Sequence, residues 1–443
     1  MRAPLQKYGR LKTIIRTIGN AIGTVFSMSL VSTATLLSVP AAAQTSVTTG
    51  KPAGGTGPRA EVIHWWTAGG ESSAVKSLAE SYRAAGGVWI DNAVALGEQA
   101  RAVALNRMVG GNPPTAAQFN TTNQFKDMID QGMLNNVDAV AQRDGWDKFL
   151  PEIVLNIVRV KGHYYAAPVD IHMPTWIWYS KAVFKKAGIT TEPKTMDELF
   201  IDLDKIRAAG FIPLAHGGQS WQDNIVFTTV LSNVGGRELY LKVLRDRDQK
   251  AIMSEPFKKV LLTFKRLQSY VDKGSPGRNW NDATAMIING KAGVQFMGDW
   301  AKGEFSVAKQ EADRDYGCIP GFGDKSLYII QGDVFVFPKT TQPDQIKAQN
   351  LLASVIITPS TQVAFSRNKG SIPIRTDVDA NKLDACAQKG LAIMKDKTRQ
   401  IGNGEVYLTP DQNGALADAL TNYWNSNIPV EKVQRNIISA LGS

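Results

Sequence analysis

The sequence predicts an α/β fold with more than one domain, and three observations support this. The chain has 443 residues, a length that suits two domains or one large one. Short apolar runs alternate with segments of helical periodicity in its first third, the order that places helices on the faces of a sheet. An aromatic, extended stretch at residues 163–180 is typical of a chain passing between two domains rather than through one core.

The first predicted elements alternate between strand and helix. "AEVIHWW" is typical of a strand, and "SSAVKSLAESYRAA" has apolar residues near helical spacing, with Ser72 and Ser73 available as caps. "VWIDNAVAL" predicts a strand and "ARAVALNRMVGG" a helix that ends at Gly110 and Gly111. "PPTAAQFNTT" predicts a short strand and "NQFKDMIDQGM" another helix. This β-α-β-α-β order indicates a sheet covered by helices.

The rest of the chain is predicted to be largely helical, with extended segments in between. "HYYAAPVDIHMPTWIWYS" is extended and contains two prolines. "TMDELFIDLDKIRAAG" begins a helix, with Thr195 as its cap and Glu198 completing a capping box. Helices are expected to about Ala283. They are followed by a strand turning into a helix in "AGVQFMGDWAKGEF", a hairpin in "SLYIIQGDVFVFPKTT", a helix in "PDQIKAQNLLASVII", an extended "SRNKGSIPIRTD" and a mostly helical C-terminus.

The N-terminus has the pattern of a secretory signal peptide. Residues 1–20 carry five basic side chains and no acid, residues 21–39 form an uncharged apolar run, and "PAAAQ" follows. This order predicts that residues 1–43 are removed by cleavage after Ala43. An uncleaved anchor is the alternative, because the run is nearly long enough to span a bilayer. Residues 44–59, rich in Gly, Thr and Pro, are expected to form a disordered leader.

The charge of the chain gives little support to a nucleic-acid partner. The predicted signal carries five of the positive charges, so the formal charge of +10 falls to +5 in the mature chain. That charge is small for about 400 residues, and it lacks a Lys/Arg run interleaved with aromatics. We therefore expect no nucleic-acid partner.

Two cysteines, Cys318 and Cys386, stand 68 residues apart. Secretion would make a disulfide between them plausible. Two buried free thiols are the alternative, because nothing in the local sequence fixes their geometry. The sequence has no CxxC motif, so it gives no support to a redox role.

Motifs for catalysis and metal binding are absent from the sequence. It contains neither G-x-S-x-G nor H-E-x-x-H, and its four histidines do not stand at metal-ligand spacing. We therefore predict no catalytic residue, no cofactor and no metal site. The competing enzyme hypothesis is a secreted glycoside hydrolase that uses Glu71 and Asp299 as its two carboxylates.

An aromatic residue beside a polar hydrogen-bonding residue recurs at predicted strand ends and loops. The examples are "HWWTAGGE", "AQFNTT", "GGQSWQDN", "GRNWND" and "MGDWA", and "RNKGSIP" adds an Asn and a Lys. Flat apolar faces suit the C–H surfaces of a sugar, and carboxylates, amides and Lys suit its hydroxyl groups. A single such aromatic is more often a core residue, so it is the recurrence that indicates a pocket for a polyhydroxylated ligand.

Trp65 and Trp66 raise a question about the first strand. Neighbours in a strand point to opposite faces, so both indoles cannot fill the same core. One core and one surface tryptophan is the alternative to an aromatic platform beside a cleft. The pair is predicted at the carboxyl end of the strand, where open α/β sheets bind ligands. Glu71 follows at a helix start, a position that the helix dipole alone also favours.

Five segments together resemble the extracellular solute-binding proteins of ABC sugar importers. They are "WWTAGGE", "RMVGGNPPTAAQFN", "YAAPVDIHMPTWIWYS", "NGKAGVQFMGDWA" and "NKGSIPIRTD", and they are most similar to the glucose/mannose-binding branch. The resemblance covers roughly residues 60–440. It implies a two-lobed, clam-shell α/β fold with a hinge of three crossings and a sugar between the lobes. It also implies a periplasmic monomer whose closed form docks on an inner-membrane permease.

The resemblance implies roles for individual residues of the first lobe. Trp65 and Trp66 would supply stacking and wall contacts, and Glu71 would accept a hydrogen bond from a hydroxyl group. Gln118 and Asn120 would line the rim. A histidine stands at the position of Asn120 in a family member, so this chain departs from the family there.

Five further residues take their predicted roles from the same resemblance. Asp299 would be the main hydroxyl acceptor and Lys369 the matching donor. Trp280 and Trp221 would close the other face of the sugar from the second lobe. His172 lies near the crossing, where a packed hinge residue is the alternative.

The predicted lobes are discontinuous in the sequence. Residues 60–170 with 297–365 are expected to form the first lobe. Residues 171–296 with 366–443 are expected to form the second. A further departure concerns the last helical region, where glucose binders of this branch carry a His before a Pro. "NGEVYLTP" has no His there, and Glu405 falls nearby.

The predicted function is the periplasmic component of an ABC sugar importer that binds a glucose- or mannose-like monosaccharide. The Glu405 departure puts glucose itself in question. One alternative is a receptor of the same fold for a disaccharide, a modified or acidic sugar, or a non-sugar solute. Another is a chemoreceptor-docking or structural role that needs no ligand closure.

Overall fold

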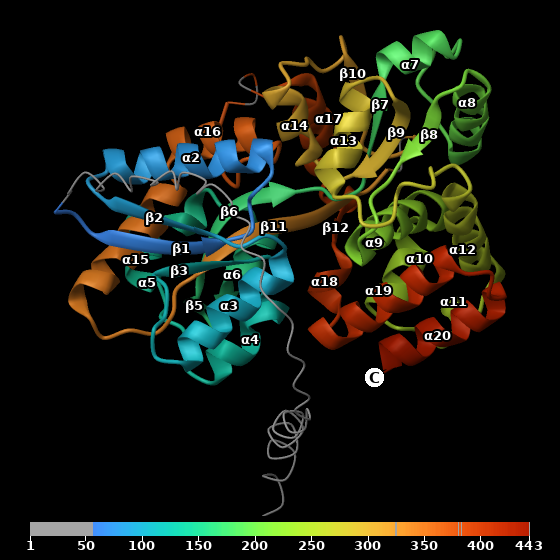
Figure 1. The fold of residues 1–443 in the computed structure, drawn as a ribbon. Helices are drawn as coiled ribbons and strands as arrows, with labels where there is room; N and C mark the ends of the chain where they lie inside the picture. The colour runs from blue at the N-terminus through green and yellow to red at the C-terminus, as the bar shows by residue number, and fades with distance from the viewer. Residues whose placement is uncertain (1–55, 324–325, 380, 382, 443) are drawn as a thin grey trace, which may run out of the picture. The chain divides into compact units, whose positions relative to one another are not determined.

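The described residues form two large β-sheets, each with its own set of helices (Figure 1), and a small sheet of the two short strands β4 (Arg159–Val160) and β5 (His163–Tyr164). The computed structural model describes residues 56–323, 326–379, 381 and 383–442. The predicted signal peptide and nearly all of the predicted leader lie outside these residues. The two-lobed α/β fold expected from the sequence is confirmed.

The first sheet contains six strands. Five of them follow the order β12-β11-β3-β1-β2, and the sixth, β6, pairs with residues 331–336 of β11. These strands are β1 (Arg59–His64), β2 (Val88–Ala93), β3 (Ala116–Phe119), β6 (Ala166–His172), β11 (Tyr328–Val336) and β12 (Gln400–Gly402). β1 runs parallel to β2 and β3, whereas β11 runs antiparallel to β3 and β6. Every residue of β3 and β6 is buried, including the polar Gln118, Asp170 and His172.

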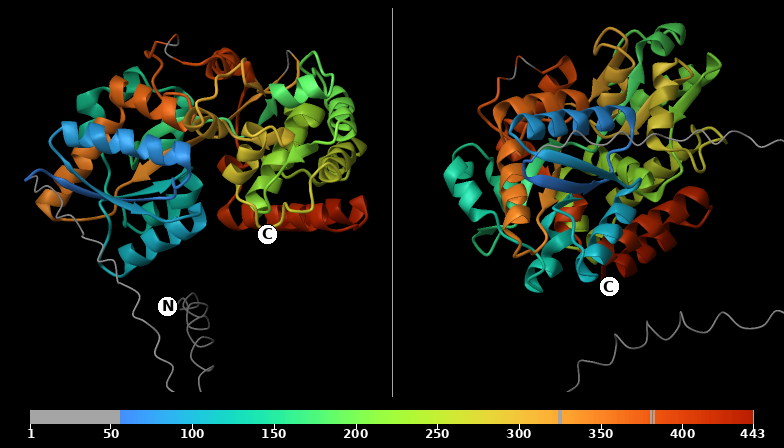
Figure 2. Two further views of the ribbon diagram at one scale, coloured as in Figure 1. Left: turned by 45° about the horizontal axis from the view of Figure 1, so that its top comes forward. Right: turned by 60° about the vertical axis from the view of Figure 1, so that its left-hand side comes forward.

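The helices of the first sheet lie on both of its faces. α2 (Gly69–Ala84) and α16 (Pro359–Lys369) lie side by side on one face in all three ribbon views, although they are far apart in sequence (Figures 1 and 2). α3 (Gly97–Val109) and α4 (Thr122–Asp130) lie on the other, and α15 (Pro343–Ile356) packs beside β1.

The second sheet has four strands in the order β10-β7-β9-β8. They are β7 (Trp176–Ser180), β8 (Ile212–Ala215), β9 (Ala292–Met297) and β10 (Tyr316–Ile319). β7 pairs antiparallel with β9 and β10, and β8 pairs parallel with β9. A second buried cluster of apolar side chains joins this sheet to α8, α9, α12, α19 and α20.

The remaining helices and short elements complete the two sets. The longer ones are α8 (Met196–Ala208), α9 (Ser220–Val230), α10 (Gly236–Leu244), α12 (Glu255–Gln268), α13 (Trp280–Ile288), α17 (Ala385–Met394), α19 (Pro410–Asn425) and α20 (Val430–Gly442). The shorter ones are α5 (Asp138–Asp144), η1 (Trp146–Lys148), α6 (Glu152–Val158), β4 (Arg159–Val160), β5 (His163–Tyr164), α7 (Lys181–Lys186), η2 (Leu231–Gly235), α11 (Gln249–Ile252), α14 (Ala301–Val307), η4 (Lys397–Arg399) and α18 (Gly404–Tyr407).

The chain passes between the two sets after β6, after β10 and after β12. Only residues 173–175 separate β6 from β7, and all three are buried. Sheet membership departs from the predicted lobe ranges in two places. β10 lies in 297–365 but pairs with β7, and β12 lies in 366–443 but pairs with β11. These pairings join residues far apart in sequence, so local patterns did not reveal them.

Several local predictions are corrected. α2 begins at Gly69, before Ser72 and Ser73, and has no side-chain cap. The predicted hairpin at 326–341 is the single strand β11. α16 continues through Lys369, so only the residues after it are extended. Thr195 caps α8 as predicted, but the carboxylate of Glu198 accepts from the backbone N–H of Lys194 rather than that of Thr195. β8 falls within the range predicted to be helical.

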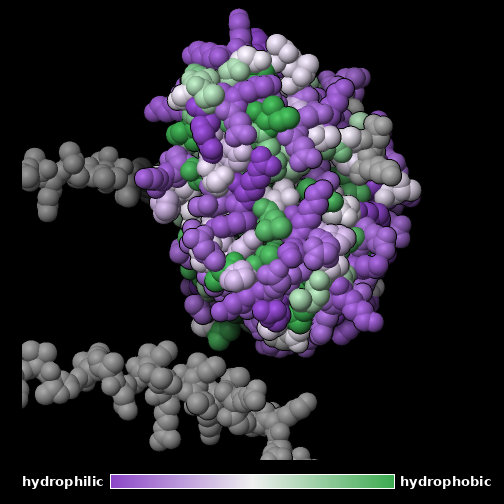
Figure 3. Space-filling view, turned by 90° about the vertical axis from the view of Figure 1, so that its right-hand side faces the viewer, coloured by the Kyte–Doolittle hydropathy of each residue, from purple (hydrophilic) through white to green (hydrophobic). Residues whose placement is uncertain are grey.

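None of the helices in the described residues is both long and apolar enough to cross a bilayer. The face drawn in Figure 3 is largely hydrophilic, and its apolar residues lie in small separate groups. Isolated exposed apolar side chains of this kind are normal for a water-exposed surface.

The two cysteines form a disulfide, so the first of the two alternatives is correct. It joins Cys318 of β10 to Cys386 of α17. β10 belongs to the second sheet, while α17 packs against β11 of the first. The bond therefore ties together parts of both sets of elements near the passages between them.

We predict that reducing this disulfide destabilises the protein. Opening a loop closed over 68 residues is expected to lower the free energy of unfolding by about 4 kcal/mol. Urea unfolding with and without a reductant measures the change. The variant with both Cys318 and Cys386 changed to Ser is the control, and its stability should not respond to the reductant. Equal stability of the oxidised and reduced wild type would contradict the prediction.

Candidate functional site

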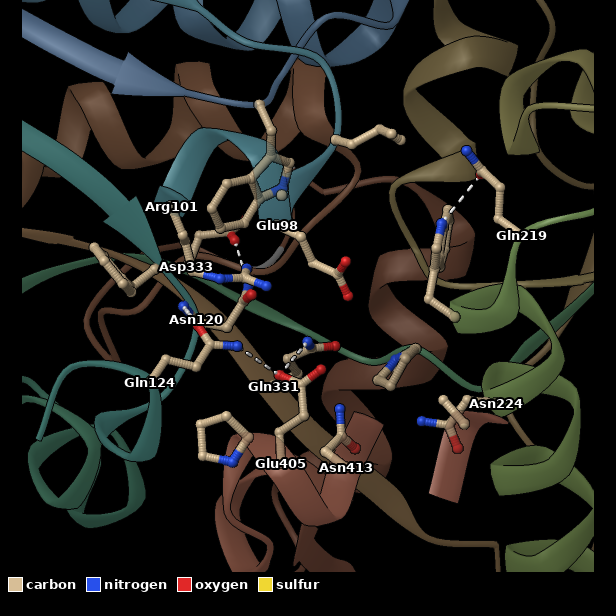
Figure 4. Close-up of a pocket in the computed structure, with 18 of the residues that line it drawn as sticks. Glu98, Arg101, Asn120, Gln124, Gln219, Asn224, Gln331, Asp333, Glu405 and Asn413 are labelled. Carbon is tan, nitrogen blue, oxygen red and sulfur yellow. Dashed lines mark hydrogen bonds between the residues drawn. The ribbon is translucent and has the colours of Figure 1, made fainter. Parts of the chain in front are cut away.

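A cavity of about 1020 Å³ opens between elements of the first and second sheets. One wall comes from the segment after β1, the start of α3 and the segment after β3. The other wall comes from the starts of α9, α13 and α19. His172 and Lys369 form part of its floor. Figure 4 shows polar side chains from both walls pointing into this space.

Seven of the ten residues predicted from the sequence lie in the lining of this cavity. They are Trp65, Glu71, Asn120, His172, Trp221, Trp280 and Lys369. Trp66, Gln118 and Asp299 do not lie in the lining, and each is at least 95% buried. The three are therefore behind the cavity surface in this structure, where they contact other residues of the protein.

The two neighbouring tryptophans point in different directions. Trp66 is 1% exposed and packs edge-on against Phe335 and Phe365 in the core of the first sheet. Trp65 is partly exposed and faces the cavity. Its backbone N–H donates to Oε1 of Gln118 at 3.0 Å. The alternative of one core and one surface tryptophan therefore describes the pair, and the surface one lines the cavity.

A buried histidine organises the floor. His172 Nδ1 forms a short contact with Oδ1 of Asp299, and Nε2 lies 3.1 Å from Oδ2 of Asp333 and 3.0 Å from Oδ2 of Asp170. The second oxygen of Asp299 accepts from the backbone N–H of Met173 at 2.9 Å. Both carboxylate oxygens of Asp299 are thus engaged inside the protein, and its role as the main acceptor for a ligand hydroxyl stays a prediction.

The histidine is charged in this environment. Burial alone would lower the pKa of His172, but the negative charges of Asp170 and Asp299 outweigh it and hold the pKa well above its ordinary value. Burial raises the pKa of Asp333, but its hydrogen bond from His172 and the charge of the imidazolium leave that pKa lowered. The site is therefore an imidazolium surrounded by carboxylates.

The same atoms have the spacing of a cation site. Ligand atoms of Asp170, His172 and Asp333 lie within 4.8 Å of one another, a grouping that residue spacing in the sequence did not indicate. Nε2 of His172 already faces both carboxylates, and the charge of Lys369 acts on all three groups. In this structure the three groups therefore form an internal ion-pair cluster.

A second buried ion pair lies beside the first. Nζ of Lys369 is 3.2 Å from Oε1 of Glu71, and it lies 5.5 Å above the ring of Trp300. Burial lowers the pKa of Lys369, but Glu71 and the neighbouring aspartates outweigh this effect and leave the pKa raised. The lysine therefore carries a positive charge in the cavity floor. It can donate to a ligand oxygen while Glu71 accepts.

Glycine at position 370 allows Lys369 to occupy this place. Gly370 ends α16 with φ of +96°, a conformation that residues with a Cβ rarely adopt. A Cβ there would also lie only 2.2 Å from the carbonyl oxygen of Asp299. The chain after Lys369 can therefore approach the Asp299 segment only with glycine at this position.

The wall and the floor are joined by amide hydrogen bonds. Gln118 and Asn120 both donate to Oδ1 of Asp333, at 3.0 and 2.8 Å. Gln118 also holds the backbone of Trp65 through its carbonyl oxygen. Gln118 therefore connects the aromatic wall to the charged floor, although it does not line the cavity itself.

Several residues of the site were not predicted from the sequence. Trp300 follows Asp299 in the "MGDWA" segment, and its ring lies 5.3 Å from that of His172 and 6.4 Å from that of Trp221. Asp333 is the one charged residue of β11, and this is the signal in the sequence that points to it. Arg101 lines the cavity from a helix whose pattern gave no signal of function.

The comparisons with known proteins place the chain in a family. A family model described as bacterial extracellular solute-binding protein matches residues 73–353, more than half of the chain. A probable sugar-binding periplasmic protein of Brucella suis biovar 1 (strain 1330) is 39% identical over 388 residues, covering 86% of this chain and 91% of the relative. One with the same description from Rhizobium meliloti (strain 1021) is 37% identical, covering 86% and 93%. The chain belongs to the bacterial extracellular solute-binding protein family.

Solved structures agree on the fold. A chitin oligosaccharide binding protein superimposes with a TM-score of 0.74 at 17% identity, over 87% of this chain and 98% of that one. The maltose-bound T. maritima MalE3 has a TM-score of 0.72 at 18% identity, over 87% and 99%. At these identities the likeness concerns the fold alone.

We predict that His172→Gln strongly destabilises the protein. Loss of the imidazolium leaves buried carboxylates without their cation, which should lower the free energy of unfolding by about 3–5 kcal/mol at pH 6. The folded pKa of His172 lies above the unfolded value of about 6.5. The stabilisation is therefore complete below about pH 6.5 and is lost as the pH rises through the folded pKa.

Urea unfolding of both proteins at several pH values measures this difference. The gap between wild type and variant should be largest at pH 6 and should narrow at alkaline pH. His216→Gln is the matched control, because His216 is also buried but contacts one carboxylate, that of Asp223, at 2.8 Å. Equal stability of His172→Gln and wild type at pH 6 would show that the imidazolium is not needed.

Proposed function

We propose that this protein is the periplasmic sugar-binding component of an ABC importer. The observation that carries the proposal is one cavity that combines indole rings from both walls with buried charged donors and acceptors on its floor. Such a combination suits a ligand with both C–H faces and hydroxyl groups. The two relatives described as probable sugar-binding periplasmic proteins support the same ligand class and location.

In this proposal, aromatic residues of both walls and charged residues of the floor contact the sugar. Trp65 on one wall, and Trp221 and Trp280 on the other, offer flat apolar faces to the ring of a sugar. Lys369 donates to a ligand oxygen, and Glu71 accepts from a hydroxyl group. Trp66, Gln118 and Asp299 act through the residues that they hold, rather than by direct contact.

Binding is coupled to transport through closure of the two lobes. A sugar that contacts both walls favours the closed state over the open one, because only the closed state makes both sets of contacts. The three passages of the chain between the sheets are the places where a hinge would bend. In this proposal a monomer in the closed state docks on an inner-membrane permease.

The ligand within this class is proposed to be a glucose- or mannose-like monosaccharide. A disaccharide or a modified sugar is the main alternative, and solved structures of the same fold are named for chitin oligosaccharide and for maltose. A non-sugar solute in the same fold is a further one. The glycoside hydrolase hypothesis is less favoured, because Asp299 does not line the cavity and cannot flank a bond together with Glu71.

We predict a saturable change of tryptophan fluorescence when the matching sugar is added. Trp65, Trp221, Trp280 and Trp300 all line the cavity, so a bound sugar alters their surroundings. The titration uses glucose, mannose, galactose, xylose and a β-linked disaccharide. Glu71→Gln should weaken binding roughly 10-fold or more, because it replaces a charged acceptor and unpairs Lys369.

Glu80→Gln is the matched control for this titration. Glu80 lies on the same helix, α2, but is exposed and outside the cavity. Its variant should bind with wild-type affinity. The absence of any response to all five sugars, with the fold intact by circular dichroism, would contradict the proposed monosaccharide or disaccharide ligand.

A further inference from the structure

Arg101 is a cation without a partner in the cavity wall. It lines the cavity from α3, and its guanidinium lies 5.5 Å from the ring centre of Trp65. It forms neither a hydrogen bond nor an ion pair with any residue that the structure describes. Burial lowers the pKa of Arg101, and the charges of Glu405 and Glu98 partly oppose this. Its N–H groups are available to a ligand because no hydrogen-bond or ion-pair partner among the described residues occupies them.

Glu405 has one carboxylate oxygen engaged and one available. Oε2 accepts from the side-chain amides of Gln124 at 3.2 Å and Gln331 at 3.4 Å. Gln124 is itself held by the backbone N–H of Asn120 at 2.9 Å. From residues 56–323, 326–379, 381 and 383–442, no donor reaches Oε1. Burial raises the pKa of Glu405, and the charge of Arg101 counteracts part of this rise.

These two charges act on one part of the cavity. Figure 4 shows Arg101, Gln124, Gln331 and Glu405 gathered on the same side, across the cavity from Asn224. Arg101 and Glu405 influence each other electrostatically but do not close into an ion pair. A separated donor and acceptor of opposite charge leaves room for a group that needs both.

We propose that Arg101 and Glu405 form a specificity-determining pair that selects a neutral sugar with two neighbouring hydroxyl groups at this end of the cavity. Arg101 donates to one hydroxyl oxygen, and Oε1 of Glu405 accepts from the other hydroxyl. This inference rests on the proposed function, since it names the chemistry of the sugar that the same cavity takes.

A charged group can satisfy only one member of the pair and is repelled by the other. A uronate placed here would bring its carboxylate against Glu405, and Asp333 and Glu98 also line the cavity. An ammonium group would meet Arg101 with the charged Lys369 also in the lining. A neutral diol instead satisfies one donor and one acceptor without adding charge. The arginine carries its charge across the physiological pH range.

The test compares neutral, acidic and amino sugars by isothermal titration calorimetry. Glucose, mannose and galactose are titrated beside glucuronate, galacturonate, glucosamine and galactosamine. The wild type should bind one neutral sugar at least 10-fold more tightly than its acidic and amino counterparts. Glu405→Gln and Arg101→Met should each weaken that neutral sugar roughly 10-fold, because each removes a charged hydrogen-bonding partner.

Each of the two variants should gain relative affinity for a different charged sugar. Glu405→Gln should raise the relative affinity for the uronate about 10-fold, and Arg101→Met should do the same for the amino sugar. Glu80→Gln and Arg83→Met are the controls. They remove the same charges from exposed positions on α2 and should leave selectivity unchanged. Arg101→Lys and Glu405→Asp keep the charges and should keep the preference for neutral sugars, which guards against effects of misfolding.

Three results would overturn the proposal. A wild type that prefers a uronate or an amino sugar contradicts the selection of neutral ligands. Wild-type selectivity in both Glu405→Gln and Arg101→Met contradicts the role of the pair, while the proposed function stands. Failure of every sugar to bind any folded variant removes the proposed function itself, and this inference with it.

Discussion

The buried imidazolium of His172 is the interaction on which the site depends. It lies at the end of β6, separated by three residues from the start of β7 in the other sheet, and it contacts Asp170, Asp299 and Asp333. Three carboxylates so close together in a buried place would repel one another without a cation among them. The histidine therefore holds strands β6 and β11 and the segment after β9 in one arrangement. That arrangement forms the floor of the cavity, between its two walls.

The residues of this floor hold other side chains in place, including ones that line the cavity. Asp333 holds Gln118 and Asn120, and Gln118 in turn holds the backbone of Trp65. Lys369 and Glu71 form the neighbouring ion pair and reach the cavity surface. Because these groups are fixed by the protein before a ligand arrives, little conformational entropy is lost on binding. The aspartates thus contribute to binding by positioning other side chains.

The sequence predicted the parts of this structure that local pattern controls. The β-α-β order of the first sheet, the Thr195 cap and the cavity position of Trp65 follow from periodicity, capping chemistry and strand ends. It could not place β11 beside β3, because that pairing joins residues more than 200 positions apart. For the same reason Asp333 was missed and the internal contacts of Asp299 were not predicted. Residue type identified Asp299 as polar, but only tertiary structure shows that His172 and Met173 already occupy its oxygens.

In the proposed function, one sugar binds between the two walls above this floor. The decisive experiment is a crystal structure of the protein with the sugar that gives the largest response in titration. We expect electron density for the sugar between Trp65 and Trp280, with its hydroxyl groups in contact with Lys369 and Glu71. His172 should still lie between its carboxylates. Sugar density elsewhere on the protein, with this cavity empty, would show that the sugar does not bind between the walls.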